Sequence, residues 1–302
     1  MPISVVIPTF NRRDSLEVVL PALLNQTYPA DQYELLLSDS GSTDGTDELV
    51  HKLNAPNLRH LVHPNNGRSG ARNDGVKEAR FDTILFTDAD IIADPKLLEK
   101  HAQVHQSQAG PTAVVGCEVQ VDTLEEYEAV KRDPWGRGRH LHQIEGDTGP
   151  RPLSWLYFLT GNASVNRQAL LDVGLFDENF TNYGHEDLEL GYRLEKHGVK
   201  MLFYPEAINY HWHPVTFTEK CRKMHLSGFA TVRMWRKHRD PSIKFKLGMN
   251  PFALGWHRLV AEDGFVMRMC KAKAQQSKLA SEVLLQYHYL DGVEEGLRTL
   301  GR

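Results

Sequence analysis

The sequence is poor in three features that would each have placed it in a special class of protein. It has three cysteines, Cys117, Cys221 and Cys270, which are too few and too widely spaced for a disulfide framework or a zinc site. No apolar run approaches the roughly 18 residues that span a bilayer. The apolar N-terminal stretch is short and contains Pro8, so we expect no signal peptide. The formal net charge of −4 gives no general positive field, so no nucleic-acid partner is expected.

These absences predict a cytoplasmic protein, or one attached at most peripherally to the inner face of the cell membrane. What remains is an ordinary globular composition. The chain has 302 residues, of which 41% are hydrophobic and 25% charged, enough for one large domain with an appendage.

Short β-rich runs alternate with segments of helical spacing through the first part of the chain. Strands are expected at 3–10, 33–39, 58–63, 82–88 and 112–121. This alternation predicts an α/β fold with a mostly parallel sheet flanked by helices.

The second half is less regular. The polar residues 122–150 are expected to form a long loop over the site. Residues 153–165 return to a sheet-like pattern, 199–205 read as another strand, and the pattern is helical from about 216. We therefore predict one α/β domain over 1–215 and a helical C-terminal extension over 216–302.

Carboxylates follow two of the expected strands. Asp88 and Asp90 come at the end of "LFTDAD", and Asp39 ends "YELLLSD". In open α/β sheets, ligands bind beyond the carboxyl ends of the strands, where Pro8 and Thr9 also close the first strand. The pattern predicts a cleft lined by carboxylates, although Asp90 as a simple turn or helix cap stays open.

A turn rich in glycine and asparagine, "NNGRSGARNDG", opens a helix and carries Arg68 and Arg72. A helix N-terminus with guanidinium groups favours an anion, and a solvated loop is the alternative. No Gly-Lys-Ser/Thr follows, and the first strand has no Gly-x-Gly-x-x-Gly after it. A Walker loop is thereby excluded, and a dinucleotide-binding dehydrogenase is disfavoured.

Two later segments carry further candidates. Glu186 and Asp187 stand at a helix start, where one could serve as a general base or both could simply complement the helix dipole. If "INYHWHP" is extended, His211 and His213 share a face with Asn209. Two carboxylates and an imidazole suit Mn²⁺ or Mg²⁺, whereas a pair of surface histidines is the alternative.

Taken in order from about residue 3 to 213, these segments resemble the family-two glycosyltransferases of the GT-A fold. The similar stretches are "SVVIPTFNR", "DSGSTDGT", "GRSGARNDG", "TDAD", "TGNASVNR", "GLFDENF" and "YGHEDLELGYRL", followed by the later histidine. The resemblance implies a nucleotide-binding half at about 1–121 and an acceptor half at about 151–215.

The resemblance also implies roles for single residues. Those expected around the nucleotide-sugar are Pro8, Thr9, Asn11, Asp39, Arg72, Asp88, Ala89, Gly161 and Asn162, with Asp39 facing the base. Asp90 would bind the metal together with Asp88 and His211, and His213 is the alternative ligand. Asp187 would be the catalytic base, with Glu186 beside it.

The implied activity is inverting, metal-dependent transfer of a sugar from a nucleotide donor, with UDP favoured and GDP or dTDP open. The implied acceptor is a hydroxyl of a glycan or a lipid-linked sugar. A sugar nucleotidyltransferase and a non-catalytic nucleotide-sugar-binding protein are the alternative hypotheses. The first has no need of the Glu186–Asp187 pair, and the second has no need of intact carboxylates.

The segment 216–250 is strongly basic, with nine Lys or Arg against two Asp or Glu. A basic amphipathic helix either packs on the catalytic domain or lies on an anionic membrane. We favour packing, and keep peripheral membrane contact through 216–256 as the alternative. Trp235, Phe252 and Trp256 would then be the interfacial anchors.

Overall fold

The computed structural model describes residues 1–137, 139–140, 149–180, 184–260, 264–274 and 276–300. Its internal contacts divide the chain into two compact units. The sheet unit comprises Met1–Asn179 and Asp187–Pro214, and the helical unit comprises Phe180–Glu186 and Val215–Arg302. The sequence analysis drew a domain boundary between residues 215 and 216, whereas the contacts group Val215 and the short segment Phe180–Glu186 with the C-terminal helices.

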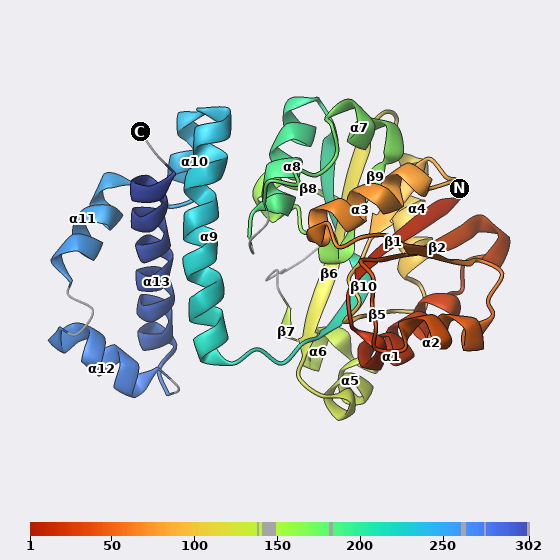
Figure 1. The fold of residues 1–302 in the computed structure, drawn as a ribbon, viewed down its shortest axis with the longest axis horizontal. Coiled ribbons are helices and arrows are strands. Elements are labelled where there is room, and N and C mark those ends of the chain that lie inside the picture. Colours follow the sequence, from red (N-terminus) through yellow and green to blue (C-terminus); the bar gives the residue numbers. More distant parts are fainter. Residues whose placement is uncertain (138, 141–148, 181–183, 261–263, 275, 301–302) are drawn as a thin grey trace. The chain divides into compact units, whose positions relative to one another are not determined.

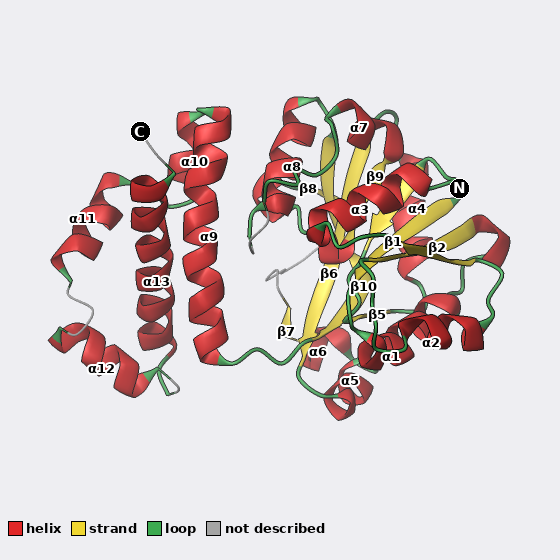
Figure 2. Ribbon diagram, viewed as in Figure 1, coloured by secondary structure: helices red, strands yellow, loops and turns green. Residues whose placement is uncertain are grey.

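One mixed sheet forms the centre of the sheet unit (Figures 1 and 2), with its main path in the order β3-β2-β1-β4-β9-β6-β10-β5. The strands of this path are β1 (Ile3–Thr9), β2 (Tyr33–Asp39), β3 (Leu58–Val62), β4 (Thr83–Phe86), β5 (Ile91–Ala93), β6 (Thr112–Val121), β9 (Ala163–Asn166) and β10 (Lys200–Trp212). Strands β3, β2, β1 and β4 pair in parallel, as do β6 and β10. Strand β9 runs antiparallel to β4 and β6, and β5 runs antiparallel to β10.

The strands at the N-terminal end of the chain read as continuous apolar runs because both of their faces are covered. Every residue of β1 and β2 is buried, as is typical of parallel strands between helices. The helices of this unit include α1 (Arg13–Leu24), α2 (Thr46–Leu53), α3 (Gly67–Glu78), α4 (Leu97–Ser107), α7 (Arg167–Asp172) and α8 (Glu186–Lys196). The predicted α/β class is confirmed.

The expected loop over 122–150 is wrong in its first part, which contains α5 (Leu124–Val130) and α6 (Pro134–Arg137). The Thr123 side chain accepts a hydrogen bond from the Glu126 amide, and Glu126 accepts one from the Asp122 amide. This is the Thr-x-x-Glu signal of a helix start, which the polar composition obscured. Two short strands, β7 (Arg139–His140) and β8 (Arg151–Pro152), follow, and 141–148 lie outside the described residues.

The sheet-like pattern expected over 153–165 is largely wrong as well. Only β9 is a strand there, preceded by the 3-10 turns Trp155–Tyr157 and Thr160–Asn162. The apolar side chains before β9 pack on α8 instead of alternating across a sheet. Trp155 meets Tyr192 edge to face at 5.5 Å, and a Cβ on Gly191 would lie 2.7 Å from Phe158.

The helical unit is built around two long helices, α9 (Phe217–His238) and α13 (Lys278–Thr299), with the shorter α10 (Pro241–Lys246), α11 (Pro251–Leu259) and α12 (Phe265–Lys273). Glycines let the two long backbones approach closely. A Cβ on Gly228 would lie 1.9 Å from the Tyr289 carbonyl oxygen, and one on Gly292 would lie 1.8 Å from that of His225. Within the described parts of the chain, no helix combines the length and apolarity that crossing a bilayer requires.

Two buried histidines tie α4 to β9 inside the sheet unit. His101 lies 2.8 Å from both Ser164 Oγ and Asn162 Oδ1, and His105 lies 2.8 Å from Ser164 Oγ. Burial lowers the pKa of His101 to about 4 and that of His105 to about 3. Both imidazoles are therefore neutral in the folded protein at neutral pH.

These lowered pKa values predict acid sensitivity. Below the ordinary histidine pKa of about 6.5, these two histidines are protonated in the unfolded chain but stay neutral in the folded one. The free energy of unfolding is therefore highest above that pH and falls as the pH is lowered toward 4. Replacing His105→Gln should make the free energy of unfolding fall less steeply over this window, by up to about 1.4 kcal/mol per pH unit. Urea unfolding at pH 7.5, 6 and 5 measures the slope. The exposed His51→Gln is the control, and equal slopes for all three proteins would contradict the prediction.

Candidate active site

The carboxyl edge of the parallel strands gathers the first set of candidate residues. Thr9 ends β1 opposite Asp39, which ends β2. The connection from β4 to β5 follows at the same edge, because β4 pairs in parallel with β1. Placed here are Pro8, Thr9, Asp39, Asp88, the buried Ala89, and Asp90.

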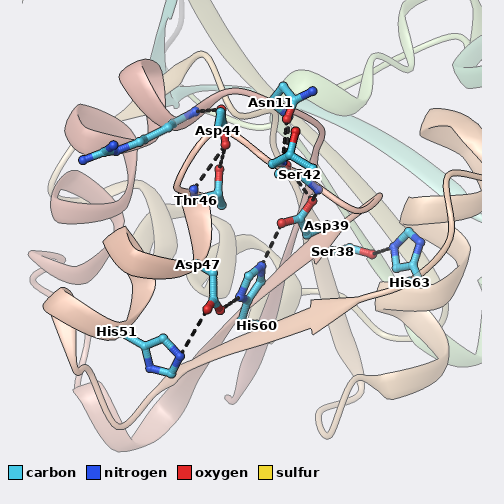
Figure 3. Close-up of polar contacts among 12 residues, drawn as sticks. Asn11, Ser38, Asp39, Ser42, Asp44, Thr46, Asp47, His51, His60 and His63 are labelled. Atoms are coloured by element: carbon cyan, nitrogen blue, oxygen red, sulfur yellow. Dashed lines mark hydrogen bonds and ion pairs between the residues drawn. The ribbon is translucent and has the colours of Figure 1, made fainter.

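Hydrogen bonds join the loops that follow β1 and β2 (Figure 3). The Asn11 amide donates to Ser42 Oγ at 2.8 Å, and Asn11 Oδ1 accepts from the Thr43 amide at 2.8 Å. Asn11 has a φ of 52°, a left-handed conformation that asparagine tolerates better than most residues. The "SDSGSTDGT" segment is therefore fixed against the end of the first strand.

Asp39, at the end of β2, holds the loop that follows this strand. Its Oδ1 accepts from the Ser42 amide at 2.8 Å and from the Ser42 hydroxyl at 2.7 Å, and its Oδ2 lies 2.9 Å from His60 Nε2. The residue is only 2% exposed. The side chain thus has partners at both oxygens, and its contact with a nucleotide base stays a prediction. His60, on β3, was not foreseen from the sequence.

Arg72 brings together candidates from three distant parts of the sequence. It lies on α3 and is 1% exposed. Its Nη2 donates to Asp88 Oδ1 at 2.7 Å, its Nη1 lies 3.6 Å from Asp187 Oδ1, and its guanidinium stands 5.5 Å from the centre of the Phe176 ring. A planar fork of donors is suited to bridging two carboxylates in this way.

Asp187 is held from its other side by the turn that precedes β9. Its Oδ1 accepts from the Thr160 hydroxyl at 2.8 Å and its Oδ2 accepts from the Thr160 amide at 3.2 Å. The side chain keeps 19% of its surface exposed. The carboxylate is therefore held in place by Thr160 and Arg72 and still has exposed surface.

The neighbouring Glu186 has a different environment. It is 6% exposed, accepts from the Gly184 amide at 3.2 Å, and groups with the helical unit, whereas Asp187 groups with the sheet unit. Its neighbour His185 has a φ of 68° and bonds to Thr231 of α9. The two adjacent carboxylates are therefore not interchangeable.

Asp90 lies between the two histidines that the sequence left as alternatives. Its Oδ1 is 3.7 Å from His211 Nε2, its Oδ2 is 3.6 Å from His213 Nδ1, and the two rings stack with centroids 5.8 Å apart. His211 is inside β10, so the extended conformation on which its facing depended is present. Burial raises the pKa of Asp90, helped by the charge of Asp88 and opposed by the histidines.

Three hydroxyls at this edge are available to hydrogen-bond a ligand. Among the described residues, the side-chain oxygens of Thr9, Ser69 and Thr87 are buried and have no hydrogen-bond partner. They stand at the ends of β1 and β4 and in the first turn of α3. Leaving a buried hydroxyl without a hydrogen bond costs free energy. A ligand that hydrogen-bonds to these hydroxyls would remove that cost and bind more tightly.

Comparison with models of protein families assigns the chain to a family. Residues 4–174 match the model of glycosyl transferase family 2, and residues 139–215 match the model described as the N-terminal domain of galactosyltransferase. The chain belongs to glycosyl transferase family 2. The resemblance read from the ordered motifs is thereby confirmed.

Relatives in family two include validoxylamine A glucosyltransferase of Streptomyces hygroscopicus subsp. jinggangensis, 33% identical over 227 residues. The alignment covers 68% of this chain and 54% of that protein, so the chain spans about half the relative's length. The hyaluronan synthase of Pasteurella multocida is 28% identical over 243 residues, which cover 70% of this chain and 24% of the synthase.

Solved structures share the fold. A mannosyltransferase from Pyrobaculum calidifontis, in complex with GDP-Man and Mn²⁺, has a TM-score of 0.63 at 20% identity, covering 98% of this chain and 87% of its own. A fragment of S. aureus TarS in complex with UDP has a TM-score of 0.57 at 18% identity, covering 98% and 91%. The predicted GT-A fold with C-terminal helices is confirmed.

In this family-two chain the sequence analysis missed one carboxylate of the site. Glu118, on β6, is 8% exposed, and its Oε1 lies 3.0 Å from His211 Nδ1. Burial lowers the pKa of His211, but the hydrogen bond and charge of Glu118, with the charges of Asp90 and Asp88, raise it overall. A single charged residue within the apolar run "TAVVGCEVQV" was the available signal.

Gly161 and Asn162 lie beside these groups in different ways. A Cβ on Gly161 would stand 2.3 Å from Glu118 Oε2, so a larger residue here would displace the Glu118 carboxylate. The Asn162 side chain points into the protein, where it donates to the carbonyls of Cys117 and Ala207 and meets His101. Its closeness to a donor sugar stays a prediction.

A metal centre is not preformed in full. Among the described residues, no group of three His, Cys, Asp or Glu side chains is arranged to hold a metal ion. Asp90 with one histidine nevertheless matches the way hard cations are often bound beside phosphates, with one or two protein ligands and the remainder from substrate oxygens and water. The donor set therefore fits a metal that arrives with a diphosphate.

The contact between Glu118 and His211 gives a direct prediction. Glu118→Gln keeps the size of the side chain but removes the charge, so the pKa of His211 should fall relative to the unchanged protein. Titrating the His211 imidazole by nuclear magnetic resonance measures it. The exposed Glu125→Gln on α5 is the matched control and should leave the pKa unchanged. An unaltered His211 pKa in Glu118→Gln would show that the contact with Glu118 does not determine the pKa of the His211 imidazole.

Proposed function

We propose that this chain is an inverting, metal-dependent glycosyltransferase that moves a sugar from a nucleoside-diphosphate donor to an acceptor hydroxyl. The observation that carries the proposal is the Arg72 bridge, which joins Asp88 of the nucleotide edge to Asp187 of the second half of the sheet unit. A displacement at an anomeric carbon needs a leaving-group site and a proton acceptor facing each other across one cleft, and these residues supply both walls.

The proposed division of labour follows from the contacts. The buried Thr9, Ser69 and Thr87 hydroxyls would meet the nucleotide. Asp90, with His211 or His213, would hold a Mn²⁺ or Mg²⁺ ion, which neutralises charge that develops on the departing diphosphate. Asp187, which accepts a hydrogen bond from Thr160 and lies beside Arg72, would accept the proton of the attacking hydroxyl.

Asp187 is preferred over Glu186 as the base because of their surroundings. Glu186 is nearly buried and groups with the helical unit, whereas Asp187 faces Arg72 and retains exposed surface. In an in-line displacement, a base and a leaving group on opposite faces of the anomeric carbon invert its configuration. We therefore propose the inverting outcome for a reaction in which Asp187 is the base.

The donor we favour is a UDP-sugar, with GDP- and dTDP-sugars as comparison arms. Support comes from the TarS structures with UDP and UDP-GlcNAc. Because the mannosyltransferase structure contains GDP-Man, GDP-sugars have to be tested beside UDP-sugars. The acceptor we favour is a glycan or lipid-linked sugar. Names among the relatives, such as hyaluronan synthase and chondroitin synthase, support a growing glycan.

The metal assignment is tested by Asp90→Ala. Calorimetry of UDP binding with and without Mn²⁺ should show that Mn²⁺ strengthens binding in the unchanged protein and no longer does so in the variant. The exposed Asp82→Asn, at the opposite end of β4, is the control for a lost carboxylate. Metal-dependent affinity that survives in Asp90→Ala would remove Asp90 from the metal site.

The role of Asp187 is tested by Asp187→Asn, which keeps the shape and removes the proton acceptor. Donor affinity should stay within a few-fold, while transfer falls by about 10²–10⁴-fold, the usual effect of losing a general base. The exposed Asp172→Asn is the control. Transfer near the unchanged rate would make Asp187 structural, and donor binding without turnover in the unchanged protein would favour a nucleotide-sugar-binding protein.

A further inference from the structure

Exposed large hydrophobic side chains are concentrated in one stretch of the sequence. Of the thirteen in the described chain, eight lie between Phe245 and Leu279. Six of these eight lie on α11 and α12, and we call the six the apolar surface: Phe252, Trp256, Leu259, Phe265, Val266 and Met269. Single exposed apolar residues are ordinary, whereas a concentration of them marks a surface that contacts something.

Helix α11 has two apolar faces, and only one of them is packed. Ala253 and Leu254 pack against the core that α9 and α13 share. Phe252, Trp256 and Leu259 follow the spacing i, i+4, i+7, which places them on one face. Phe252 and Leu259 are 90% and 87% exposed, whereas Trp256 is 37% exposed and meets the Tyr287 ring edge to face, so this second face is open except at Trp256.

Helix α12 repeats the arrangement. Met267 is fully buried and packs with Cys270 in a second core cluster. Phe265 and Met269 lie one turn apart on the opposite side and are 71% and 43% exposed. Folding the helical unit requires only the buried faces of α11 and α12. The exposed stripes therefore need another explanation.

The stretch of sequence that carries the apolar surface is rich in positive charge. Between Lys244 and Leu279 it has Lys244, Lys246, Arg258, Arg268, Lys271, Lys273 and Lys278, against the acidic Glu262 and Asp263. Two of these cations lie near carboxylates of α13, Arg258 at 2.7 Å from Glu294 and Lys278 at 3.9 Å from Glu282. Arg268 and Lys273 are exposed residues of α12, on the same helix as Phe265 and Met269. A positive and apolar surface is complementary to anionic lipid headgroups over acyl chains.

A cavity beside α12 has the same chemistry. It measures about 580 Å³ and is formed by residues of α9, of α13 and of α12 with the turn that follows it. Phe217, Leu226 and Leu284 give it apolar walls, and Arg222 and Lys271 add cationic groups. Such a lining suits an amphipathic anion better than a neutral polar molecule.

The residues that could contact a membrane differ in part from those that the sequence analysis proposed. Trp235 is not an exposed anchor, because it packs on the core cluster and Lys244 Nζ lies 3.7 Å from its ring centre. Of the basic residues of α9, Arg236 donates to the Leu300 carbonyl at 2.8 Å. Phe252 and Trp256 remain, and the surface shifts from 216–256 toward α11 and α12.

We propose that the apolar surface docks the helical unit on an anionic lipid bilayer. A second copy of this chain is a poorer occupant, because pairing the same surface on two copies would bring like charges together. The proposal goes beyond the transferase function, since it depends on neither the donor nor the acceptor. A membrane position would bring the enzyme to lipid-linked acceptors.

Co-sedimentation of the full chain with vesicles tests this. The unchanged protein should pellet with phosphatidylglycerol-containing vesicles at low salt, be released at high salt, and stay in solution with phosphatidylcholine alone. The triple variant Phe252→Ser, Leu259→Ser, Phe265→Ser should bind at least tenfold more weakly. The double variant Arg268→Gln, Lys273→Gln should bind roughly 25-fold more weakly if both cations lie near the headgroups.

The matched control is Val62→Ser with Leu124→Ser, which removes exposed apolar side chains from the sheet unit. It should pellet like the unchanged protein. UDP affinity, measured in parallel, should be the same in all variants, so a failure of the nucleotide site is distinguished from a failure of docking. No pelleting with anionic vesicles at low salt overturns the proposal. A dimer in sedimentation analysis that the triple variant abolishes also overturns it, in favour of a second copy.

Discussion

The arrangement of the active site depends on one buried cation. Arg72 is almost fully enclosed, and an enclosed guanidinium is stable only where carboxylates surround it. Asp88 and Asp187 meet that need from opposite sides, and Phe176 covers the guanidinium. Because Asp88 follows β4 and Asp187 opens α8, this single charge fixes the nucleotide edge of the sheet against the segment that carries the proposed base.

The other contacts of the site reinforce the same edge by different means. Thr160 holds Asp187 through its amide and hydroxyl, and Asn11 with Ser42 holds the first two loops together. On β6, Glu118 contacts Nδ1 of the His211 ring, and the other ring nitrogen, Nε2, faces Asp90. A carboxylate that orients a histidine in this way sets its tautomer and raises its basicity. The metal-binding candidates are thus oriented by a residue that would not itself touch the metal.

The division between the two units has a consequence for the base. It separates Glu186 from Asp187, although they are adjacent in the chain and both begin α8. The helical unit takes Phe180–Glu186, and within it Gly184 and His185 contact Ser227 and Thr231 of α9. The boundary between the two units therefore falls between the two carboxylates that are candidates for the base.

The sequence by itself determined the parts that depend on local pattern: the buried parallel strands, the carboxylates at their ends, and the motifs that identify the family. It could not determine which residues meet across long separations, because pairing depends on burial and sheet order. Arg72 with Asp187, Glu118 with His211, and the inward side chain of Asn162 emerged only from the fold. Apolar composition likewise misled at 153–165, where side chains bury against a helix. It also could not decide which face of α11 is packed, since both faces are apolar and only the position of α13 decides which one is covered.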